Sequence, residues 1–333
     1  MISVLVPVRN CVAWVEDALR SMANQTVLPD EILVADDAST DGTPERIESL
    51  RIPGVKLLRS SENLGISTQL NRMIELAQGR YLARMDGDDI SHPLRLQQQL
   101  AAMESSSVGI IGTRVRRFGA SRTKHRFAIQ DSELKAGLLF STPFCHPSVV
   151  IDRDRVGSFQ YDPEFDMAED YHLWVRLRTQ ATYGNVPAIL VNWRIHDRNV
   201  GVKIETADIQ RRLAGKIRDM LLESYGVVLS TSERVALEAR ARSEALDLAG
   251  NQALLGALIA LGNVPEDRLL APRTALSNVL AAQWNLSCLI SAWKTPGVMA
   301  LWRTGCRKLS AHPSPLTFSK LLLKAILGTN RNV

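Results

Sequence analysis

The chain has 333 residues, of which 45% are hydrophobic and 23% charged, a composition typical of a globular protein with room for two domains. The net charge of +5 is unevenly placed, because residues 268–333 hold nine Lys and Arg and no acid. Cys11, Cys145, Cys288 and Cys306 are too far apart for a zinc or redox motif, so we expect reduced thiols in a cytoplasmic protein.

Neither a signal peptide nor a transmembrane helix is expected. The first apolar run, residues 2–8, is too short and is interrupted by Pro7. The longest uncharged stretch late in the chain, residues 274–293, contains Ser, Asn and Gln residues that make it a poor membrane span.

The first 90 residues alternate between short apolar runs and amphipathic segments. Buried strands are expected at residues 2–8, 31–35, 55–59 and 80–85. Helical spacing of apolar residues follows the first strand and precedes the fourth. This alternation predicts an α/β fold of the doubly wound type, with a mostly parallel sheet, helices on both faces and ligands bound beyond the carboxyl ends of the strands.

Acidic residues follow two of these strand ends. Asp36 and Asp37 come after the second strand, and Asp86, Asp88 and Asp89 come after the fourth. Because parallel strands end at the same edge of a sheet, we expect both clusters to face one crevice.

The second cluster has two explanations when it is considered alone. Gly87 permits a bend that brings Asp86 and Asp88 together around a hard divalent cation such as Mg2+, which prefers oxygen ligands. Alternatively, Asp-Gly forms an ordinary turn before a helix that starts at Pro93, with solvated acids near its positive end. These residues alone leave both readings open.

Two common nucleotide-binding motifs are absent from the sequence. No GxGxxG follows the first strand and there is no GxxxxGK[ST], which argues against a dinucleotide oxidoreductase and a P-loop phosphotransferase. A nucleotide diphosphate could still be held through a metal ion.

Five motifs occur in a recognisable order: SVLVPVRN, DEILVADDASTDGT, ENLGISTQLNRMIELAQGRYLARMDGDDISHPLRLQQQ, AEDYHLWVRL and NWRIHDRN. With them the chain resembles the family 2 glycosyltransferases of GT-A fold, and more closely the bacterial members that build surface polysaccharides. The resemblance covers roughly residues 1–200. We therefore expect a GT-A catalytic domain at residues 1–203 and a helical C-terminal domain at 204–333, with its basic tail from residue 268.

The resemblance implies a nucleotide-sugar donor, with a UDP-sugar favoured. By position, Pro7 and Arg9 would line the base and ribose pocket, and Asp37 would accept a hydrogen bond from the nucleobase, as the imide N–H of uracil allows. The alternative is that these loop acids only form Asx-turns. We favour that structural role for Asp36 and Asp41.

The same resemblance assigns the metal site. Asp88 would bind Mg2+ or Mn2+ directly and Asp86 would lie nearer the donor's ribose or sugar, while Asp89 either shares this work or caps the next helix. Arg84 would pair with a phosphate or neutralise the acids. His196 would bind the metal or a phosphate oxygen, unless it is an ordinary surface residue.

Asp170 matches the catalytic base of inverting members, which takes a proton from the acceptor hydroxyl. Its pKa should be raised by neighbouring Glu169 and lowered by the helix amino terminus, and the sequence does not decide between these effects. Glu169 is assigned to contact with the acceptor or to support of Asp170. His146 would border the acceptor cleft, although a turn before the next strand explains it equally well.

The last third of the chain has a helical pattern, with helices expected at residues 211–225, 232–248, 252–261, 275–292 and around 316–327. Basic residues interleaved with Trp284, Trp293 and Trp302 suit an anionic membrane surface, which would make the protein peripheral on the cytoplasmic face. They also suit a packing or dimerisation domain with tryptophans in its core. No nucleic-acid-binding motif is present.

These observations predict a metal-dependent, inverting glycosyltransferase that transfers a hexose-type sugar from a nucleotide diphosphate to a glycan or lipid-linked acceptor in surface polysaccharide synthesis. The alternative is a non-catalytic sugar-nucleotide-binding or scaffold protein of the same fold. A nucleotidyltransferase would require a Gly- and Arg-rich loop after the first strand, which residues 8–11 do not supply.

Overall fold

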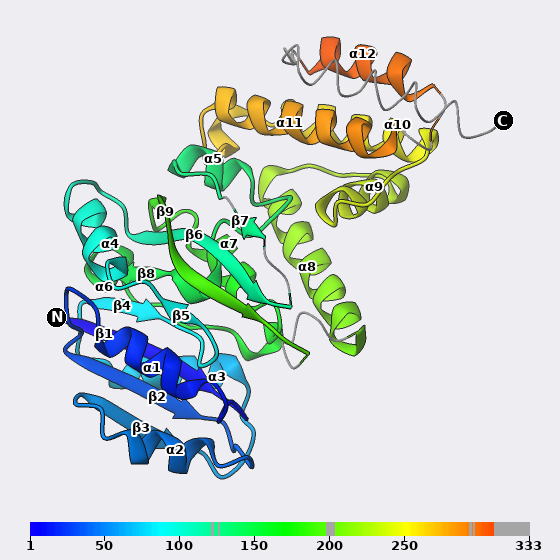
Figure 1. Ribbon diagram of the computed structural model, residues 1–333. Helices are drawn as coiled ribbons and strands as arrows, with labels where there is room; N and C mark the ends of the chain where they lie inside the picture. Colours follow the sequence, from blue (N-terminus) through cyan, green and yellow to red (C-terminus); the bar gives the residue numbers. More distant parts are fainter. Residues whose placement is uncertain (121–122, 126, 198–203, 293–294, 296, 310–333) are drawn as a thin grey trace. The chain divides into compact units, whose positions relative to one another are not determined.

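The computed structural model describes residues 1–120, 123–125, 127–197, 204–292, 295 and 297–309 (Figure 1). Contacts between residues divide the chain into two compact units. The first contains residues 1–134 and 142–217, and the second contains residues 135–141 together with the chain from residue 218 onward.

A nine-stranded sheet forms the first unit. Its strands are β1 (Ile2–Val8), β2 (Glu31–Asp36), β3 (Val55–Arg59), β4 (Tyr81–Arg84), β5 (Ile90–Ser91), β6 (Ile110–Gly119), β7 (Lys124–His125), β8 (Val150–Asp152) and β9 (Tyr183–Ile195). The order across the sheet is β3-β2-β1-β4-β8-β6-β9-β5, and β7 pairs with β6. Strands β3, β2, β1 and β4 are parallel, as are β6 and β9, whereas the pairings of β8 with β4 and β6, of β5 with β9 and of β7 with β6 are antiparallel.

The expected α/β class is confirmed, and the parallel half of the sheet is the half that the apolar runs predict. Strands β1 and β3 have the predicted ends, β2 is one residue longer at its carboxyl end, and β4 is one residue shorter at each end. All six residues of β2 are buried. A parallel strand covered on both faces reads as a continuous apolar run, which is why these strands can be recognised in the sequence.

Helices and short 3-10 turns connect these strands, and helix α8 follows the last of them. They are α1 (Val15–Ala23), α2 (Thr43–Leu50), α3 (Ile66–Leu76), α4 (Arg95–Glu104), α5 (Asp131–Ala136), η1 (His146–Ser148), α6 (Arg153–Val156), η2 (Pro163–Phe165), α7 (Glu169–Leu177) and α8 (Ile204–Tyr225). Helix α1 illustrates the packing, since Val15, Leu19 and Met22 lie on one face and join the apolar residues of β1 and β2 in a single core cluster.

The second unit is helical. It contains α9 (Thr231–Ala241), α10 (Leu248–Gly262), the turn η4 (Glu266–Arg268), α11 (Arg273–Ser291) and α12 (Val298–Lys308). Ser230 and Glu233 form a capping box at the start of α9, and the Asp247 side chain caps α10. The sequence did not predict α12, and the helix expected around residues 316–327 lies outside the described residues.

Two of the three late tryptophans are core residues of this unit. Trp284 and Trp302 are 0% and 3% exposed, and the Trp284 indole N–H donates to the Trp302 carbonyl at 3.2 Å. Trp293 lies outside the described residues. Within the described parts of the chain, no helix combines the length and the apolar character that crossing a membrane requires.

Candidate active site

Three carboxylates gather where β4 ends. One oxygen from each of Asp86, Asp88 and Asp89 lies within 4.8 Å of the others. Gly87 is required here because a Cβ at this position would lie 2.6 Å from Val8 Cγ1, not because it takes a left-handed conformation. The loop after β4 is therefore pressed directly against the end of β1.

Burial and mutual repulsion act on these acids. Burial raises the pKa of Asp88, and the neighbouring Asp86 raises it further. The pKa of Asp89 is well above its ordinary value for the same reasons. Asp86 and Asp88 keep 28% and 21% of their side-chain surface exposed, so they form the accessible part of the cluster.

Asp89 is hydrogen-bonded to strand β9 and does not cap a helix. It is fully buried, and its Oδ1 accepts a hydrogen bond from the Arg194 backbone N–H at 2.7 Å. The following helix, α4, begins at Arg95, and no side chain caps it. Asp89 therefore connects the acidic loop to the neighbouring strand.

The end of β9 makes two further contacts with this loop. The Arg194 guanidinium donates to the Asp88 carbonyl at 2.7 Å, and His196 Nε2 lies 2.9 Å from Asp88 Oδ2. The His196 ring also stacks on Trp14 with centroids 4.0 Å apart. The sequence analysis missed Trp14 and Arg194: Arg194 lies inside a quoted motif, whereas no spacing pattern points to Trp14.

Arg84 is a buried cation beside the cluster. It is 6% exposed and pairs with Asp86 at 2.5 Å, and this pairing keeps its pKa raised although burial opposes it. Its Nε and Nη1 atoms are buried and have no hydrogen-bond partner among the described residues. Two strong donors are thus held next to the acids without an acceptor of their own.

Asp170 and Glu169 lie in the first turn of helix α7. The Arg84 charge acts on the pKa of both acids as well as pairing with Asp86. Buried His146 lies between Tyr161, whose hydroxyl is 2.8 Å from Nε2, and Glu169, whose carboxylate is 3.4 Å from Nδ1. The sequence analysis did not single out Tyr161, because only the folded chain brings it to His146.

The protonation of this group follows from its burial. Burial raises the pKa of Glu169 to about 7, and it lowers the pKa of His146 to about 3, so His146 is neutral at neutral pH. The pKa of Asp170 is raised, first by burial and then by Glu169. The sequence left open whether the pKa of Asp170 is raised or lowered, and its surroundings in the structure raise it.

Asp37, in the loop after β2, is hydrogen-bonded to the loop after β3 and to helix α3. Asp37 is 7% exposed and accepts hydrogen bonds from the backbone N–H groups of Leu64 and Gly65 and from the Gln69 amide. Among the described residues Oδ2 accepts only one of these three bonds, and a carboxylate oxygen can accept two.

The remaining predicted residues of this region lie at the same strand end. Pro7 is near the end of β1, and exposed Arg9 follows that strand. Asp36 accepts from the Ser39 N–H, and Asp41 accepts from the backbone N–H groups of Val12 and Thr43, as expected for loop acids that close turns.

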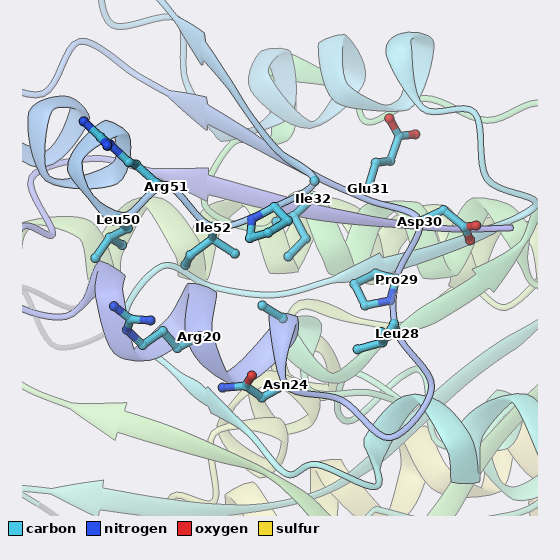
Figure 2. Close-up of a pocket in the computed structure, with 13 residues that line it drawn as sticks. Arg20, Asn24, Leu28, Pro29, Asp30, Glu31, Ile32, Leu50, Arg51 and Ile52 are labelled. Atoms are coloured by element: carbon cyan, nitrogen blue, oxygen red, sulfur yellow. The ribbon is translucent and has the colours of Figure 1, made fainter.

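A separate pocket of about 490 Å³ lies at the opposite edge of the sheet (Figure 2). It is lined by the end of α1 and by the residues that precede β2 and β3, including Arg20, Asp30 and Arg51. Ligands of this fold class bind beyond the carboxyl ends of strands, so the acidic edge is the candidate active site.

Comparison with known proteins decides the family. Residues 3–155 match the model for Glycosyl transferase family 2. The amylovoran biosynthesis glycosyltransferase AmsE of Erwinia amylovora is 30% identical over 189 residues, which cover 54% of this chain and 70% of AmsE. The chain belongs to glycosyl transferase family 2. This confirms the resemblance seen in the five motifs.

Another similar protein is WfgD of Escherichia coli, a UDP-Glc:alpha-D-GlcNAc-diphosphoundecaprenol beta-1,3-glucosyltransferase. It is 25% identical over 177 residues, which cover 53% of this chain and 69% of WfgD. The matches to two further curated relatives each span 66% of the relative's length, slightly less than two thirds.

Solved structures confirm the fold. S. aureus TarS 1-349 in complex with UDP-GlcNAc aligns with a TM-score of 0.58 at 16% identity, covering 87% of this chain and 90% of TarS 1-349. The mannosyltransferase PcManGT of Pyrobaculum calidifontis, in complex with GDP-Man and Mn2+, aligns with a TM-score of 0.51 at 18% identity, covering 98% and 86% of the two chains. At these identities the likeness establishes the fold alone.

Proposed function

We propose that this family 2 member is a metal-dependent, inverting glycosyltransferase that moves a sugar from a nucleotide diphosphate, with a UDP-sugar favoured, to a glycan or lipid-linked acceptor in surface polysaccharide synthesis. One observation carries the proposal: Arg84 pairs with Asp86, one of the two accessible acids Asp86 and Asp88, and its charge also acts on Asp170, a half-buried acid of raised pKa. Inverting transfer needs a leaving-group site and a base on opposite sides of the reacting carbon.

The acid cluster fits a divalent cation. Its oxygen donors converge within 4.8 Å, and burial together with the charge of Asp86 raises the pKa of Asp88, an effect that a bound cation would oppose. Asp88 and Asp86 would hold Mn2+ or Mg2+, with His196 beside Asp88. A cation there would neutralise negative charge on the departing diphosphate.

Arg84 would act on the same leaving group. Its two unbonded donors, Nε and Nη1, suit phosphate oxygens, and its pairing with Asp86 orients the guanidinium before the donor binds. Pro7, Arg9 and Asp37 would receive the nucleoside, and the second acceptor position of Asp37 Oδ2 suits the imide N–H of uracil.

Asp170 would be the catalytic base. Its carboxylate takes the proton of the acceptor hydroxyl while that oxygen bonds to the anomeric carbon and the bond to the diphosphate oxygen breaks on the opposite side. A raised pKa makes Asp170 a stronger base than an ordinary carboxylate, and Glu169, His146 and Tyr161 would hold it in place.

The relatives support the substrate classes. WfgD is named for a UDP-glucose donor and a diphosphoundecaprenol-linked acceptor, and the neighbouring structures contain UDP-GlcNAc or GDP-Man with Mn2+. A lipid-linked acceptor would place the reaction at the cytoplasmic face of a membrane. The end of the basic tail that would contact such a surface, residues 310–333, lies outside the described residues.

Donor binding and turnover separate this proposal from a non-catalytic sugar-nucleotide-binding protein. A thermal-shift screen of UDP- and GDP-sugars with and without Mn2+ should show a rise in Tm that depends on both ligand and metal. Isotope-labelled donor should then give transfer or slow hydrolysis. Binding without either reaction would favour the scaffold alternative, and no binding across the common nucleotide sugars would refute both.

A further inference from the structure

Strands β6 and β7 form a hairpin with a pocket of about 430 Å³ that the functions proposed above do not use. The pocket is lined by Arg116, Arg117, Phe118, Gly119, Thr123 and Lys124. Three of its six residues are cations, and none is an acid.

Two of the cations oppose each other directly. Arg116 and Lys124 are cross-strand partners in the antiparallel pair, and both are exposed. The backbone bond from Arg117 N–H to the Thr123 carbonyl, 2.8 Å long, fixes this register. Neither cation forms an ion pair with an acid among the described residues. Like charges placed directly opposite each other destabilise a sheet, and a bound anion would remove that cost.

The third cation is held by an aromatic ring. The Arg117 guanidinium lies over the Trp193 ring, 4.7 Å from its centroid. Its Nε atom is buried and has no hydrogen-bond partner in the described part of the chain. A guanidinium held flat in this way presents a rigid set of donors, which matches the oxygens of a phosphate.

The pocket adjoins the candidate active site along two paired strands. In the register of β6 and β9, Arg117 pairs with Trp193 and Gly119 pairs with Ile195. The residue after Ile195 is His196, which contacts Asp88. Trp193 also packs against the small core cluster that contains Cys145, the neighbour of His146.

The pocket at the opposite edge of the sheet provides a contrast. It is of similar size, but its lining includes Asp30 and Glu31 as well as Arg20 and Arg51 (Figure 2). Arg20 is also paired with Glu16 at 2.8 Å. Opposite charges therefore balance there, whereas the hairpin pocket carries one sign only.

We propose that the pocket between β6 and β7 binds a phosphate-bearing group of the acceptor, with a diphosphate ester as the chemical class. This rests on the proposed function, in which the acids after β4 and Arg84 serve the donor's diphosphate. The hairpin cations then serve the second substrate. Three cations suit a group with two or more negative charges better than the single charge of a sugar carboxylate.

Inorganic pyrophosphate is the probe for this site. Isothermal titration calorimetry in metal-free buffer should show binding to the full chain and at least tenfold weaker binding to the double variant Arg116→Gln/Lys124→Gln. The matched control Arg51→Gln, in the balanced pocket, should bind as the wild type does. Unchanged binding in the double variant, or no binding by the wild type at millimolar pyrophosphate, would overturn the site.

Two further measurements separate the alternatives. If the double variant loses binding to phosphatidylglycerol vesicles in a sedimentation assay but keeps its pyrophosphate affinity, the hairpin is a membrane contact and the proposal is wrong. UDP binding with Mn2+ should be unchanged in the double variant, which also shows that it is folded. A wild type that binds pyrophosphate at the hairpin but shows no UDP binding would refute the proposed function and leave this site standing.

Discussion

At the scale of single residues, Glu169 and Asp170 are adjacent acids in different surroundings. Glu169 is buried and faces neutral His146, and its pKa is raised to about 7. The pKa of Asp170 is also raised, but this residue keeps part of its surface exposed. A general base must come within hydrogen-bond reach of the proton that it takes. The difference in exposure therefore makes Asp170, and not Glu169, the residue that we expect to take the acceptor proton.

Replacing Asp170 with Asn should lower kcat by about 100-fold to 10,000-fold, the usual contribution of a general base, and should leave the affinity for the donor unchanged. Steady-state kinetics and calorimetry with the nucleotide measure the two effects. Asp154→Asn, a change at an exposed acid that pairs with Arg80, is the matched control and should be neutral. Transfer at the wild-type rate in the Asp170 variant would refute the assignment.

The buried carboxyl of Glu169 should also shape the pH dependence of stability. Its folded pKa of about 7 lies above its unfolded value, so it lowers stability as the pH rises from about 4.5 to about 7. The neutral isostere in Glu169→Gln should therefore increase the free energy of unfolding at pH 8, on the order of 2 kcal/mol, and change it little at pH 5.

Urea unfolding at the two pH values provides this test. His146 has the opposite dependence, because its lowered pKa makes stability rise with pH between about 3 and 6.5. Comparing the variant with the wild type at each pH cancels that background. Equal changes at both pH values would contradict the raised pKa of Glu169.

At the scale of elements, the close approach of β1 and the loop after β4 makes Gly87 a sensitive position. A methyl group there would collide with Val8 and displace the loop that carries Asp86 and Asp88. Gly87→Ala should weaken Mn2+-dependent nucleotide binding at least tenfold while the protein stays folded. Gly262→Ala, where the nearest atom would be 3.7 Å away, is the control that should bind normally.

At the like-charge pair of the hairpin, Arg116 and Lys124, we expect a substitution to stabilise the protein. Arg116→Gln removes the repulsion with Lys124 and should raise the free energy of unfolding by about 0.2–1 kcal/mol. The gain should shrink at high salt, because screening weakens repulsion between exposed charges. Lys56→Gln is a control of opposite sign, since Lys56 pairs with Glu31 at 2.9 Å. A loss of stability in the Arg116 variant would contradict the description of the pair as strained.

Elements differ in how well the sequence predicts them, and the difference follows the range of their contacts. Strands β1 to β4 are predicted from short runs rich in apolar residues, and the acids that follow β2 and β4 are found with them. The pairings of β9 with β6 and β5 join residues about 75 to 100 positions apart, so no local pattern reveals them. The contacts of Asp89 with Arg194 and of His196 with Asp88 depend on those pairings.

At the scale of the whole molecule, the helical unit is discontinuous in sequence. Residues 135–141 belong to it although strands β8 and β9 of the first unit come later in the sequence. The apolar side chains of Leu138, Leu139 and Phe140 in this segment are all buried. A cut in the chain near residue 204, where the sequence suggests a domain boundary, therefore does not separate the two units cleanly.

A chain truncated after residue 217 should keep the strands and acids of the first unit but expose this segment. We expect it to bind the dye ANS and to aggregate at micromolar concentration, whereas the full-length chain should do neither. Fluorescence titration and light scattering measure both properties. The same truncation with Leu138, Leu139 and Phe140 replaced by Ser should lose the dye binding, and persistent binding would show that the exposed surface lies elsewhere.

The discontinuous unit also sets an order of events during synthesis. Residues 135–141 leave the ribosome before the helices that will bury them, and 76 residues separate the segment from residue 218, where the second unit resumes. At translation rates of roughly 5–20 residues per second, this interval lasts about 4–15 seconds. During that time the apolar segment of the nascent chain has no helices to pack against. Whether the nascent chain avoids aggregation then depends on chaperones or on how fast the remaining residues are synthesised.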